Sequence, residues 1–456
     1  MFLSAPKIAS LLQQKPASDF AFTGISTDTR TVQPGFLFVA LAGESTDGHN
    51  FITDAIKKGA KGIVHRNDFP TPSAVISFPV ADTLLAYRKL AHAWRKEFSF
   101  PVLAVCGSAG KTTSKELLAA ILRGKYKSVL QTLASQNGFT GIPATMLRLT
   151  KETDIAVIEV GIDEPGAMEQ HLEIVDPDGG LLSSIGPEHL EKLIDVKTVA
   201  EEETKLFTTL EKRKGLIAIN ADDPYILAGG KKLQQGTRLS YGIENASAQI
   251  RARIIPKGDL GDLVVTGFGP KEEHFPLPLE GSHNAQNLLG ALTLAHLAGC
   301  TPDEMRKGLS SFKAPPGRSE VHSWRGVKVY ADTYNANPAS VTAALEMLKP
   351  DAKSTVWACL GDMLELGTLE ESLHRSLADP IQKAKVGHVF LFGDRMKNLE
   401  SELKLRNYSG EVRHFSDLEA LAEELSVRAK AGDRILLKGS RGMRMERAWE
   451  SLAKKA

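Results

Sequence analysis

One stretch decides the fold of this chain: Val102-Leu103-Ala104-Val105-Cys106-Gly107-Ser108-Ala109-Gly110-Lys111-Thr112-Thr113. Its apolar run predicts a buried strand, and the Gly-rich turn after it opens a helix at a Lys and two hydroxyls. The glycines let backbone N–H groups approach phosphate oxygens, while the helix N-terminus and the Lys111 ammonium supply positive charge. The stretch therefore predicts a nucleotide phosphate site, with Thr112 placed to ligate the accompanying Mg²⁺.

The spacing of this turn is G-x-x-G-K-T-T, because Val105 stands where the longer generic P-loop has its first glycine. The alternative interpretation is a Gly-rich turn between a strand and a helix with an exposed Lys. The apolar run before the turn and the helical pattern after it favour the phosphate site.

Composition excludes several classes of protein. The 456 residues are 42% hydrophobic and 24% charged, as in an ordinary globular protein. Lys and Arg number 56 against 55 Asp and Glu, so no global field favours nucleic acid or an anionic membrane. The three cysteines are far apart, which argues against a disulfide framework or a zinc site and favours a reducing cytoplasm. We expect no signal peptide and no membrane span.

The sequence pattern predicts an α/β fold along the whole chain, and we expect three domains. Residues 1–98 alternate strand-like runs at 35–41 and 62–64 with helical patterns, ending in a helix at 84–98, as in a small α/β domain. Residues 99–312 alternate strands and helices in the manner of a parallel sheet covered on both faces.

Two features complete this organisation. Short alternating runs between about 237 and 280 predict a small antiparallel flap on the central domain. The Ala-Pro-Pro-Gly at 314–317 is the best candidate for a linker. Residues 313–456 then repeat the strand-helix pattern of a doubly wound, Rossmann-like domain.

Polar residues at two strand ends are candidates for the Mg²⁺ site. Glu159 follows the apolar run 155–158, and His189 lies shortly after the run 181–185. Ligands of open α/β sheets gather beyond the carboxyl ends of the strands, so both residues should lie near the P-loop. A hydrogen-bonded structural role for His189 is an equally good interpretation, because His is an uncommon Mg²⁺ ligand.

A third candidate lies on a predicted helix over 196–210, whose apolar stripe contains Glu203. A carboxylate in a buried stripe requires a cation or hydrogen-bond donors, because its desolvation alone costs several kcal/mol. Glu201 and Glu202 fall outside the stripe, and we assign them to a solvated face.

Several motifs together resemble the Mur ligases, the amide-forming enzymes of peptidoglycan synthesis. The resemblance covers essentially the whole chain and is strongest with the members that add D-alanyl-D-alanine. Its motifs are Ser26-Thr27-Asp28-Thr29-Arg30, Asp47-Gly48-His49-Asn50-Phe51, the G-x-x-G-K-T-T loop, Gly186-Pro187-Glu188-His189-Leu190-Glu191, Gly281-Ser282-His283-Asn284-Ala285-Gln286-Asn287, Asp332-Thr333-Tyr334-Asn335-Ala336-Asn337-Pro338, Leu360-Gly361-Asp362-Met363-Leu364-Glu365-Leu366-Gly367 and Lys438-Gly439-Ser440-Arg441-Gly442-Met443-Arg444-Met445-Glu446.

The resemblance implies an ATP-dependent ligase that joins D-alanyl-D-alanine to UDP-N-acetylmuramoyl-tripeptide through an acyl phosphate, with Mg²⁺ and without nucleic acid. The chain could act as a monomer. Closure about the 313–318 linker is implied. ATP contacts are implied for Gly107, Ser108, Gly110, Lys111, Thr112, Thr113, Asn284, Asn287, Arg318 and Asp332. Catalytic or metal roles are implied for Lys111, Thr112, Glu159, His189 and Glu203, and substrate contacts for Ser26, Thr27, Thr29, Arg30, Asp47, Asn137, Tyr334, Asn335 and Asn337.

Simpler interpretations remain for several of these residues. Asn284 and Asn287 could be a helix N-cap and a turn residue, and the 335–338 loop could be only a turn before a helix. Glu203 could pair with a buried cation.

The chain also departs from the family pattern. Cys106 replaces the usual Thr, and the segment 161–166 lacks the family's Asn-His. Only Asn137 is clearly matched in the normally Asn-rich loop at 135–141. Glu203 occupies the position of a lysine that the family carbamylates to bind its second metal, unless a local shift makes Lys205 the modified residue.

Two other functions remain open at this stage. A sister ligase such as folylpolyglutamate synthase shares the P-loop but lacks the Tyr-Asn-Ala-Asn-Pro loop. A P-loop switch protein would use the D-x-x-G at 163–166, but the chain has no Asn-Lys-x-Asp motif for reading a guanine base.

Overall fold

The computed structural model describes residues 3–15, 18–43, 46–257, 260–348 and 354–455. The chain divides into two compact units. The first comprises Met1–Val102, Leu130–Ile158 and Gln170–Asp176, and the second comprises Leu103–Val129, Glu159–Glu169 and Pro177–Ala456. The predicted domain boundaries at 98/99 and 312/313 stay predictions.

The first unit contains a four-stranded parallel sheet in the order β1-β2-β3-β4. The runs predicted at 35–41 and 62–64 are β2 and β3, and the helix predicted at 84–98 is α3. The elements are α1 Ala5–Leu11, β1 Gly24–Ser26, β2 Phe36–Val39, η1 Gly48–Phe51, α2 Ile52–Lys57, β3 Gly62–Arg66, β4 Ile76–Val80 and α3 Thr83–Arg95, followed wholly or partly in this unit by β6 Val129–Gln131, α5 Gly141–Met146, β7 Ile155–Glu159 and α6 Ala167–Val175.

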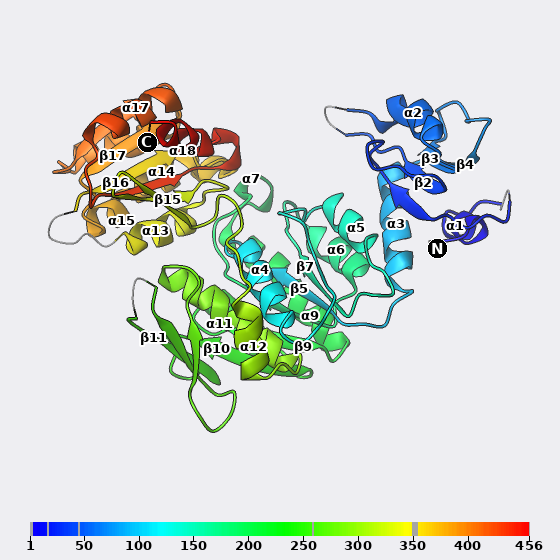
Figure 1. Ribbon diagram of the computed structural model, residues 1–456, viewed down its shortest axis with the longest axis horizontal. Coiled ribbons are helices and arrows are strands. Elements are labelled where there is room, and N and C mark those ends of the chain that lie inside the picture. The colour runs from blue at the N-terminus through cyan, green and yellow to red at the C-terminus, as the bar shows by residue number, and fades with distance from the viewer. Residues whose placement is uncertain (1–2, 16–17, 44–45, 258–259, 349–353, 456) are drawn as a thin grey trace. The chain divides into compact units, whose positions relative to one another are not determined.

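The second unit holds the P-loop in a sheet whose strands here run in the order β13-β12-β11-β10-β9-β8-β5 (Figure 1). Neighbouring strands from β5 to β11 are parallel, and β11, β12 and β13 are antiparallel. The predicted flap is therefore real but begins later than 237, because β10 pairs in parallel with β9. The strands are β5 Val102–Cys106, β8 Gly179–Leu182, β9 Leu216–Asn220, β10 Thr237–Gly242, β11 Ile250–Ile255, β12 Asp262–Thr266 and β13 Glu273–Pro276.

The helices of this region differ from the prediction at one point. The single helix predicted over 196–210 is two helices that meet at Thr204, whose hydroxyl donates a hydrogen bond to the Ala200 carbonyl at 2.7 Å. Such bonds back to the preceding turn compete with helix continuation. The helices are α4 Lys111–Leu122, α7 Leu190–Leu193, α8 Val196–Glu203, α9 Lys205–Lys212, α10 Pro224–Lys231, α11 Ser282–Leu297 and α12 Pro302–Leu309.

A third sheet follows, in the order β14-β15-β19-β16-β17-β18, parallel except for β14. This is the expected doubly wound domain. The prediction missed β14 and β18, which are edge strands with half-exposed polar residues and lack a long apolar run. The elements are β14 Glu320–Trp324, β15 Val327–Asp332, α13 Pro338–Met347, β16 Val356–Gly361, η2 Gly367–Leu369, α14 Glu370–Ser376, α15 Ala378–Lys383, β17 His388–Phe392, α16 Met396–Leu405, β18 Glu411–Phe415, α17 Leu418–Arg428, β19 Arg434–Lys438, η3 Arg441–Met443 and α18 Glu446–Ala453.

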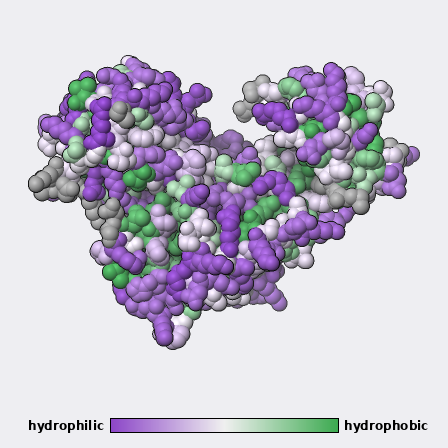
Figure 2. Space-filling view, in the orientation of Figure 1, coloured by the Kyte–Doolittle hydropathy of each residue, from purple (hydrophilic) through white to green (hydrophobic). Residues whose placement is uncertain are grey.

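The surface agrees with the composition. On the face shown in Figure 2, hydrophilic residues predominate and hydrophobic residues form small scattered groups. No helix in the described part of the chain is both long enough and apolar enough to span a membrane.

Candidate active site

The predicted P-loop joins β5 to α4, and two of its glycines are required by geometry. Gly107 has a φ of 115° and Gly110 a φ of 85°, in the region that side chains disfavour. A Cβ at Gly107 would lie 2.5 Å from the Ser183 hydroxyl, and one at Gly110 would lie 2.4 Å from the Asn287 side-chain oxygen. Helix α4 begins after Gly110 without a side-chain cap, which leaves its N-terminus open to an anion.

Three glutamates lie against this loop. The Gly107 N–H donates to Glu203 Oε2 at 3.0 Å, and Lys111 Nζ donates to Glu188 Oε2 at 3.1 Å. The Thr112 hydroxyl donates to Glu159 Oε1 at 3.0 Å. Carboxylate oxygens thus accept hydrogen bonds from groups that the sequence assigns to phosphates and Mg²⁺. The arrangement shows that these donors converge on anionic oxygen.

Each of the three has one buried oxygen without a hydrogen-bond partner, but Glu188 and Glu159 have Lys111 and Lys115 within ion-pair distance. Glu203 is fully buried and, among the described residues, accepts its hydrogen bond from the Gly107 N–H. Burial raises its pKa to about 8, with Lys111 opposing this shift. The prediction that Glu203 lies in the buried stripe of its helix is confirmed. A half-satisfied buried carboxylate is a group that a cation would stabilise.

The neighbouring acid corrects one prediction. Glu202 is not on a solvated face: it is 4% exposed and accepts a hydrogen bond from the Met168 N–H at 2.9 Å. Lys205 Nζ lies 2.7 Å from its Oε2. Glu202 is buried because these two donors stabilise its charge, whereas Glu201 is exposed as expected. Lys205 is thereby committed to Glu202, and Glu203 is the residue that faces the P-loop.

Lys111 is held by the carboxylates around it. Its side chain is 13% exposed. Burial by itself would lower the pKa of Lys111, but the negative charges of Glu188 and Glu203 outweigh burial and raise it. The ammonium therefore stays charged, as neutralisation of phosphates requires.

A further lysine, absent from the sequence prediction, supports Glu159. Lys115 lies one turn along α4 from Lys111 and is fully buried. Its Nζ is 3.7 Å from Glu159 Oε2 and 2.8 Å from Glu116 Oε1. The spacing i, i+4 from Lys111 is the signal that could have identified it.

His189 lies at the start of α7 with a φ of 49°, and its Nδ1 is 2.6 Å from Glu365 Oε2 of the third domain. Within the described ranges no three His, Cys, Asp or Glu side chains converge as a metal cluster. Mg²⁺ in nucleotide sites is held by one or two carboxylates together with phosphates and water, not by a closed protein cage. The Thr112 hydroxyl with Glu159, and the unpartnered oxygen of Glu203, fit that kind of site.

A cavity of about 290 Å³ lies beside the P-loop, where the central and third domains both contribute residues. Many predicted residues line it, but Gly107, Lys111, Thr112, Glu159, His189, Glu203 and Tyr334 do not. The predicted residues that line it are Ser108, Gly110, Thr113, Asn284, Asn287, Arg318, Asp332, Asn335 and Asn337, and those not predicted include Asn220, His283, Gln286 and Lys438.

The third-domain wall of this cavity contains an ion pair between the buried Lys438 and the partly buried Asp332. Lys438 Nζ contacts Asp332 Oδ2 and donates to the Asn335 carbonyl at 2.9 Å. Burial alone would raise the pKa of Asp332, but Lys438 outweighs it and the pKa is lowered. The two residues are opposite each other in the register of β15 and β19. The sequence prediction missed Lys438 although it ends a strand, which was the available signal.

The asparagines have distinct local roles. The interpretation of Asn284 as an N-cap is wrong, because Gly281 precedes the first residue of α11. Asn284 donates to the Glu280 carbonyl at 2.7 Å, and Asn287 accepts from the Ser114 hydroxyl at 3.2 Å. Asn337 does cap α13, accepting from the Ser340 N–H at 2.8 Å, and it also lines the cavity.

Tyr334 lies at the border of the cavity. The Arg318 guanidinium carbon is 4.2 Å from the centre of its ring, and that of Arg441 is 5.6 Å away. Both distances are within the range of cation–π contacts. The adjacent Asn335 accepts a hydrogen bond from the Ala336 N–H at 2.9 Å.

The other predicted substrate residues lie in the first unit. Ser26 Oγ accepts from the Asp28 N–H at 3.0 Å, and Arg30 Nη2 is 2.6 Å from Asp28 Oδ2. Asp47 Oδ1 lies 2.6 Å from His49 Nδ1. Thr27 and Thr29 are half-buried in the same turn, and Asn137 is half-buried in the loop between β6 and α5. These turns place polar groups at strand ends of the first sheet.

Comparisons with known proteins match three family models: the Mur ligase family catalytic domain over residues 21–94, the Mur ligase middle domain over 105–295, and the Mur ligase glutamate ligase domain over 317–441. The chain is 31% identical to the UDP-N-acetylmuramoyl-tripeptide–D-alanyl-D-alanine ligase of Bacillus subtilis, covering 93% of this chain and 91% of the relative. It is 32% identical to the ligase of the same name from Escherichia coli, covering 95% and 94%.

Solved structures give the same result. A crystal structure of MurF from Acinetobacter baumannii matches with a TM-score of 0.86 and 25% identity over 99% of each chain. MurF from Thermotoga maritima in complex with ADP matches with a TM-score of 0.84 and 27% identity over 95% of this chain and 97% of that one. The three-domain α/β architecture expected from the sequence is thus confirmed.

Proposed function

Since the chain belongs to the Mur ligase family, we propose that it is an ATP-dependent ligase that joins D-alanyl-D-alanine to the tripeptide of UDP-N-acetylmuramoyl-tripeptide. The observation that carries this proposal is the cavity in which the P-loop faces Asn335 and Asn337 of the third domain. Relatives named for this activity align over more than nine-tenths of the chain.

The chemistry requires two steps. A carboxylate oxygen of the tripeptide attacks the γ-phosphorus of ATP, the bond to ADP breaks, and an acyl phosphate forms. The amine nitrogen of the dipeptide then attacks the acyl carbon, inorganic phosphate leaves with the bonding electron pair, and the nitrogen loses a proton. Because an unactivated carboxylate resists amines, the first step supplies the leaving group.

The P-loop residues would serve the first step. Lys111 and the N-terminus of α4 would offset the repulsion between the tripeptide carboxylate and the γ-phosphate. Gly107, Ser108, Gly110 and Thr113 would hold phosphate oxygens through the loop backbone and hydroxyls. The side chains of Glu188 and Glu203 would give up their present donors, Lys111 and the Gly107 N–H, to the phosphates.

Two Mg²⁺ ions are part of this proposal. Thr112 would hold the ion that accompanies the ATP phosphates, and Glu159, His189 and Glu203 would hold the second. When bound, the two ions would screen the charge of the phosphates and of the substrate carboxylate. Lys115 lies 3.7 Å from Glu159, and Glu203 accepts from the P-loop with Oε2 while its Oε1 has no hydrogen-bond partner.

The remaining contacts follow from position. Asn284, Asn287, Arg318 and Asp332 would contact ATP, and Tyr334, Asn335 and Asn337 the dipeptide. Ser26, Thr27, Thr29, Arg30, Asp47 and Asn137 would hold the UDP-tripeptide. We place the substrate-binding, ATP-binding and closing domains at 1–98, 99–312 and 313–456, with residues 313–318 as the hinge. The buried free thiols of Cys106, Cys300 and Cys359 support a reducing, cytoplasmic location.

Phosphate release tests the proposal. The purified protein should release phosphate from ATP only when UDP-N-acetylmuramoyl-tripeptide and D-alanyl-D-alanine are both present, with the UDP-pentapeptide detected by mass spectrometry. GTP should not replace ATP, and glutamate with a folate acceptor should not support turnover. Turnover with glutamate would indicate a different ligase, and nucleotide hydrolysis without either substrate would contradict a ligase.

A further inference from the structure

We propose that Arg441 binds the terminal carboxylate of the incoming dipeptide; this inference rests on the proposed function. The acceptor has an amine at one end, which must reach the acyl carbon, and an anion at the other. That anion needs a cation outside the nucleotide cavity, and a guanidinium can bind a carboxylate through two parallel hydrogen bonds.

The position of Arg441 relative to Tyr334 carries the argument. Arg318 and Arg441 both lie beside the ring of Tyr334, at 4.2 and 5.6 Å from its centre. Arg318 lines the nucleotide cavity, and Arg441 does not. Arg441 thus lies beside the ring of Tyr334 but outside the cavity that would hold the nucleotide. A carboxylate bound there would not compete with the phosphates for this cation.

The guanidinium of Arg441 is also available. Its side chain is 64% exposed, and in the described part of the chain it donates one hydrogen bond, to Glu446 Oε1 at 3.1 Å. A guanidinium has five N–H donors, so an edge remains for a ligand. Two other cations of the site are already paired with carboxylates: Lys438 with Asp332, and Lys111 with Glu188.

The turn that carries Arg441 is tied to the Asn335–Asn337 loop. The Ser440 hydroxyl donates to the Ala336 carbonyl at 3.2 Å, and it accepts from the Leu364 N–H at 2.9 Å. The Ser440 N–H donates to the Asp362 carbonyl at 3.0 Å. These bonds hold the turn that carries Arg441 against the Asn335–Asn337 loop. The dipeptide could therefore bind to both segments at once.

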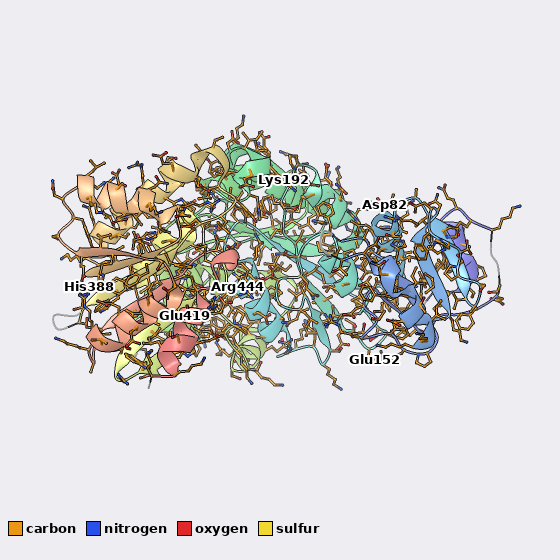
Figure 3. The ribbon with its side chains drawn as sticks, turned by 90° about the horizontal axis from the view of Figure 1, so that it is seen from above. Asp82, Glu152, Lys192, His388, Glu419 and Arg444 are labelled. Atoms are coloured by element: carbon orange, nitrogen blue, oxygen red, sulfur yellow. The ribbon has the colours of Figure 1, made fainter. Side chains whose placement is uncertain are left out.

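Arg444 provides a matched control. It belongs to the same turn and is exposed, but it lines a separate hollow with Phe392, Ser416 and Arg447. Figure 3 labels it near the C-terminal helices. If only the positive charge of this turn mattered, substitution of Arg444 would weaken dipeptide use as much as substitution of Arg441.

The test compares D-alanyl-D-alanine with its C-terminal amide, which lacks the negative charge. Arg441→Ala should raise KM for the dipeptide about 10- to 100-fold, the range expected for losing a charge-assisted hydrogen-bonded pair, with KM for ATP and UDP-tripeptide nearly unchanged. Arg441→Lys should recover part of the loss. The wild type should use the amide as poorly as Arg441→Ala uses either acceptor, and Arg444→Ala should behave as wild type.

Two results would overturn the inference. One is that Arg441→Ala loses activity, relative to wild type, equally with D-alanyl-D-alanine and with its C-terminal amide. The other is an Arg444→Ala variant with the larger defect. Failure of the wild type to turn over D-alanyl-D-alanine at all would instead contradict the proposed function. Circular dichroism and ADP affinity of Arg441→Ala check that the exposed substitution leaves the fold and the nucleotide site intact.

Discussion

Two acids at the candidate site, the fully buried Glu203 beside the P-loop and the partly buried Asp332 in the third domain, have opposite environments. Glu203 has one backbone N–H and an unpartnered oxygen, and burial raises its pKa. Asp332 has the Lys438 ammonium and the Ser319 N–H, and its pKa is lowered. A satisfied pair builds a rigid wall, whereas a half-satisfied acid is prepared for a ligand that the protein itself does not supply.

Of the substitutions considered, removal of the Lys111 ammonium should have the largest effect on turnover. Lys111→Ala leaves Glu188 and Glu203 without their nearest positive charge, and the phosphates without theirs. We expect turnover to fall at least about 100-fold, the scale of losing a preorganised electrostatic donor, with the fold retained. Steady-state phosphate release and circular dichroism measure this, with the exposed Lys404→Ala as control. Near-normal ATP consumption would contradict the P-loop assignment.

Neutralising Glu203 should separate ligand binding from folding. Glu203→Gln keeps the shape and the acceptor for the Gly107 N–H but removes the charge that a metal would use. We expect activity to fall roughly 10- to 100-fold, the scale reported for altered metal-site partners, and Mg²⁺ to strengthen the binding of a fluorescent ADP less than in wild type.

The matched control for Glu203 is Glu202→Gln, on the same helix and also buried. Its carboxylate is already held by Lys205 and the Met168 N–H. It should affect stability, because Lys205 keeps only the exposed Glu169, at 3.5 Å, as an acidic partner, and it should leave the Mg²⁺ dependence of ADP binding unchanged. If ADP binding by Glu203→Gln depended on Mg²⁺ as in wild type, Glu203 would have a structural role and would not bind the metal.

Breaking the ion pair between Asp332 and Lys438 should lower the free energy of unfolding. Asp332→Asn leaves the buried Lys438 ammonium uncompensated, which costs roughly 3 kcal/mol of unfolding free energy. Because the folded-state pKa of Asp332 is lowered, its stabilisation is present above its ordinary pKa of 3.8 and is lost as pH falls below that value. Urea unfolding at several pH values should show a gap between wild type and Asp332→Asn that narrows in acid. A gap that is constant with pH would show that the ion pair contributes little.

Next to that wall, Asn335 should have a smaller and selective effect. Asn335→Ala removes a side chain at the cavity but not the Lys438 contact, which uses the Asn335 carbonyl. We expect KM for ATP or D-alanyl-D-alanine to rise about 5- to 10-fold, the loss of one hydrogen bond of about 1 kcal/mol, with little change in the affinity for UDP-tripeptide. An isolated loss of UDP-tripeptide affinity would place this loop elsewhere.

The last prediction is that bicarbonate has no effect on the reaction rate. Glu203 carries a carboxylate on its own side chain, so activity should not depend on CO₂. Added bicarbonate at mildly acidic pH should leave the rate of both wild type and Glu203→Gln unchanged. Strong stimulation of the wild type by bicarbonate would mean that a lysine is modified after all and that Glu203 has another role.

The candidate site was predictable where chemistry is local. The G-x-x-G-K-T-T turn, the strand that ends in Glu159 and the buried position of Glu203 all follow from residue spacing, and the structure places them together. Glu202 was mispredicted because its burial depends on Lys205 and on a backbone N–H from α6, neither of which a helical pattern reveals. The α8–α9 break at Thr204 and the parallel pairing of β10 likewise depend on neighbours.

The sequence by itself therefore determined the α/β class and the Gly-rich turn between β5 and α4, because strand and helix periods and Gly-rich turns are encoded within a few residues. The residues proposed to carry the chemistry stay a prediction. Only the tertiary structure decided which carboxylates are satisfied. Lys438 reaches Asp332 across 106 positions of chain, and the Gly107 N–H reaches Glu203 across 96. Charge pairing in a buried site depends on distance in space, and strand register and helix packing set that distance.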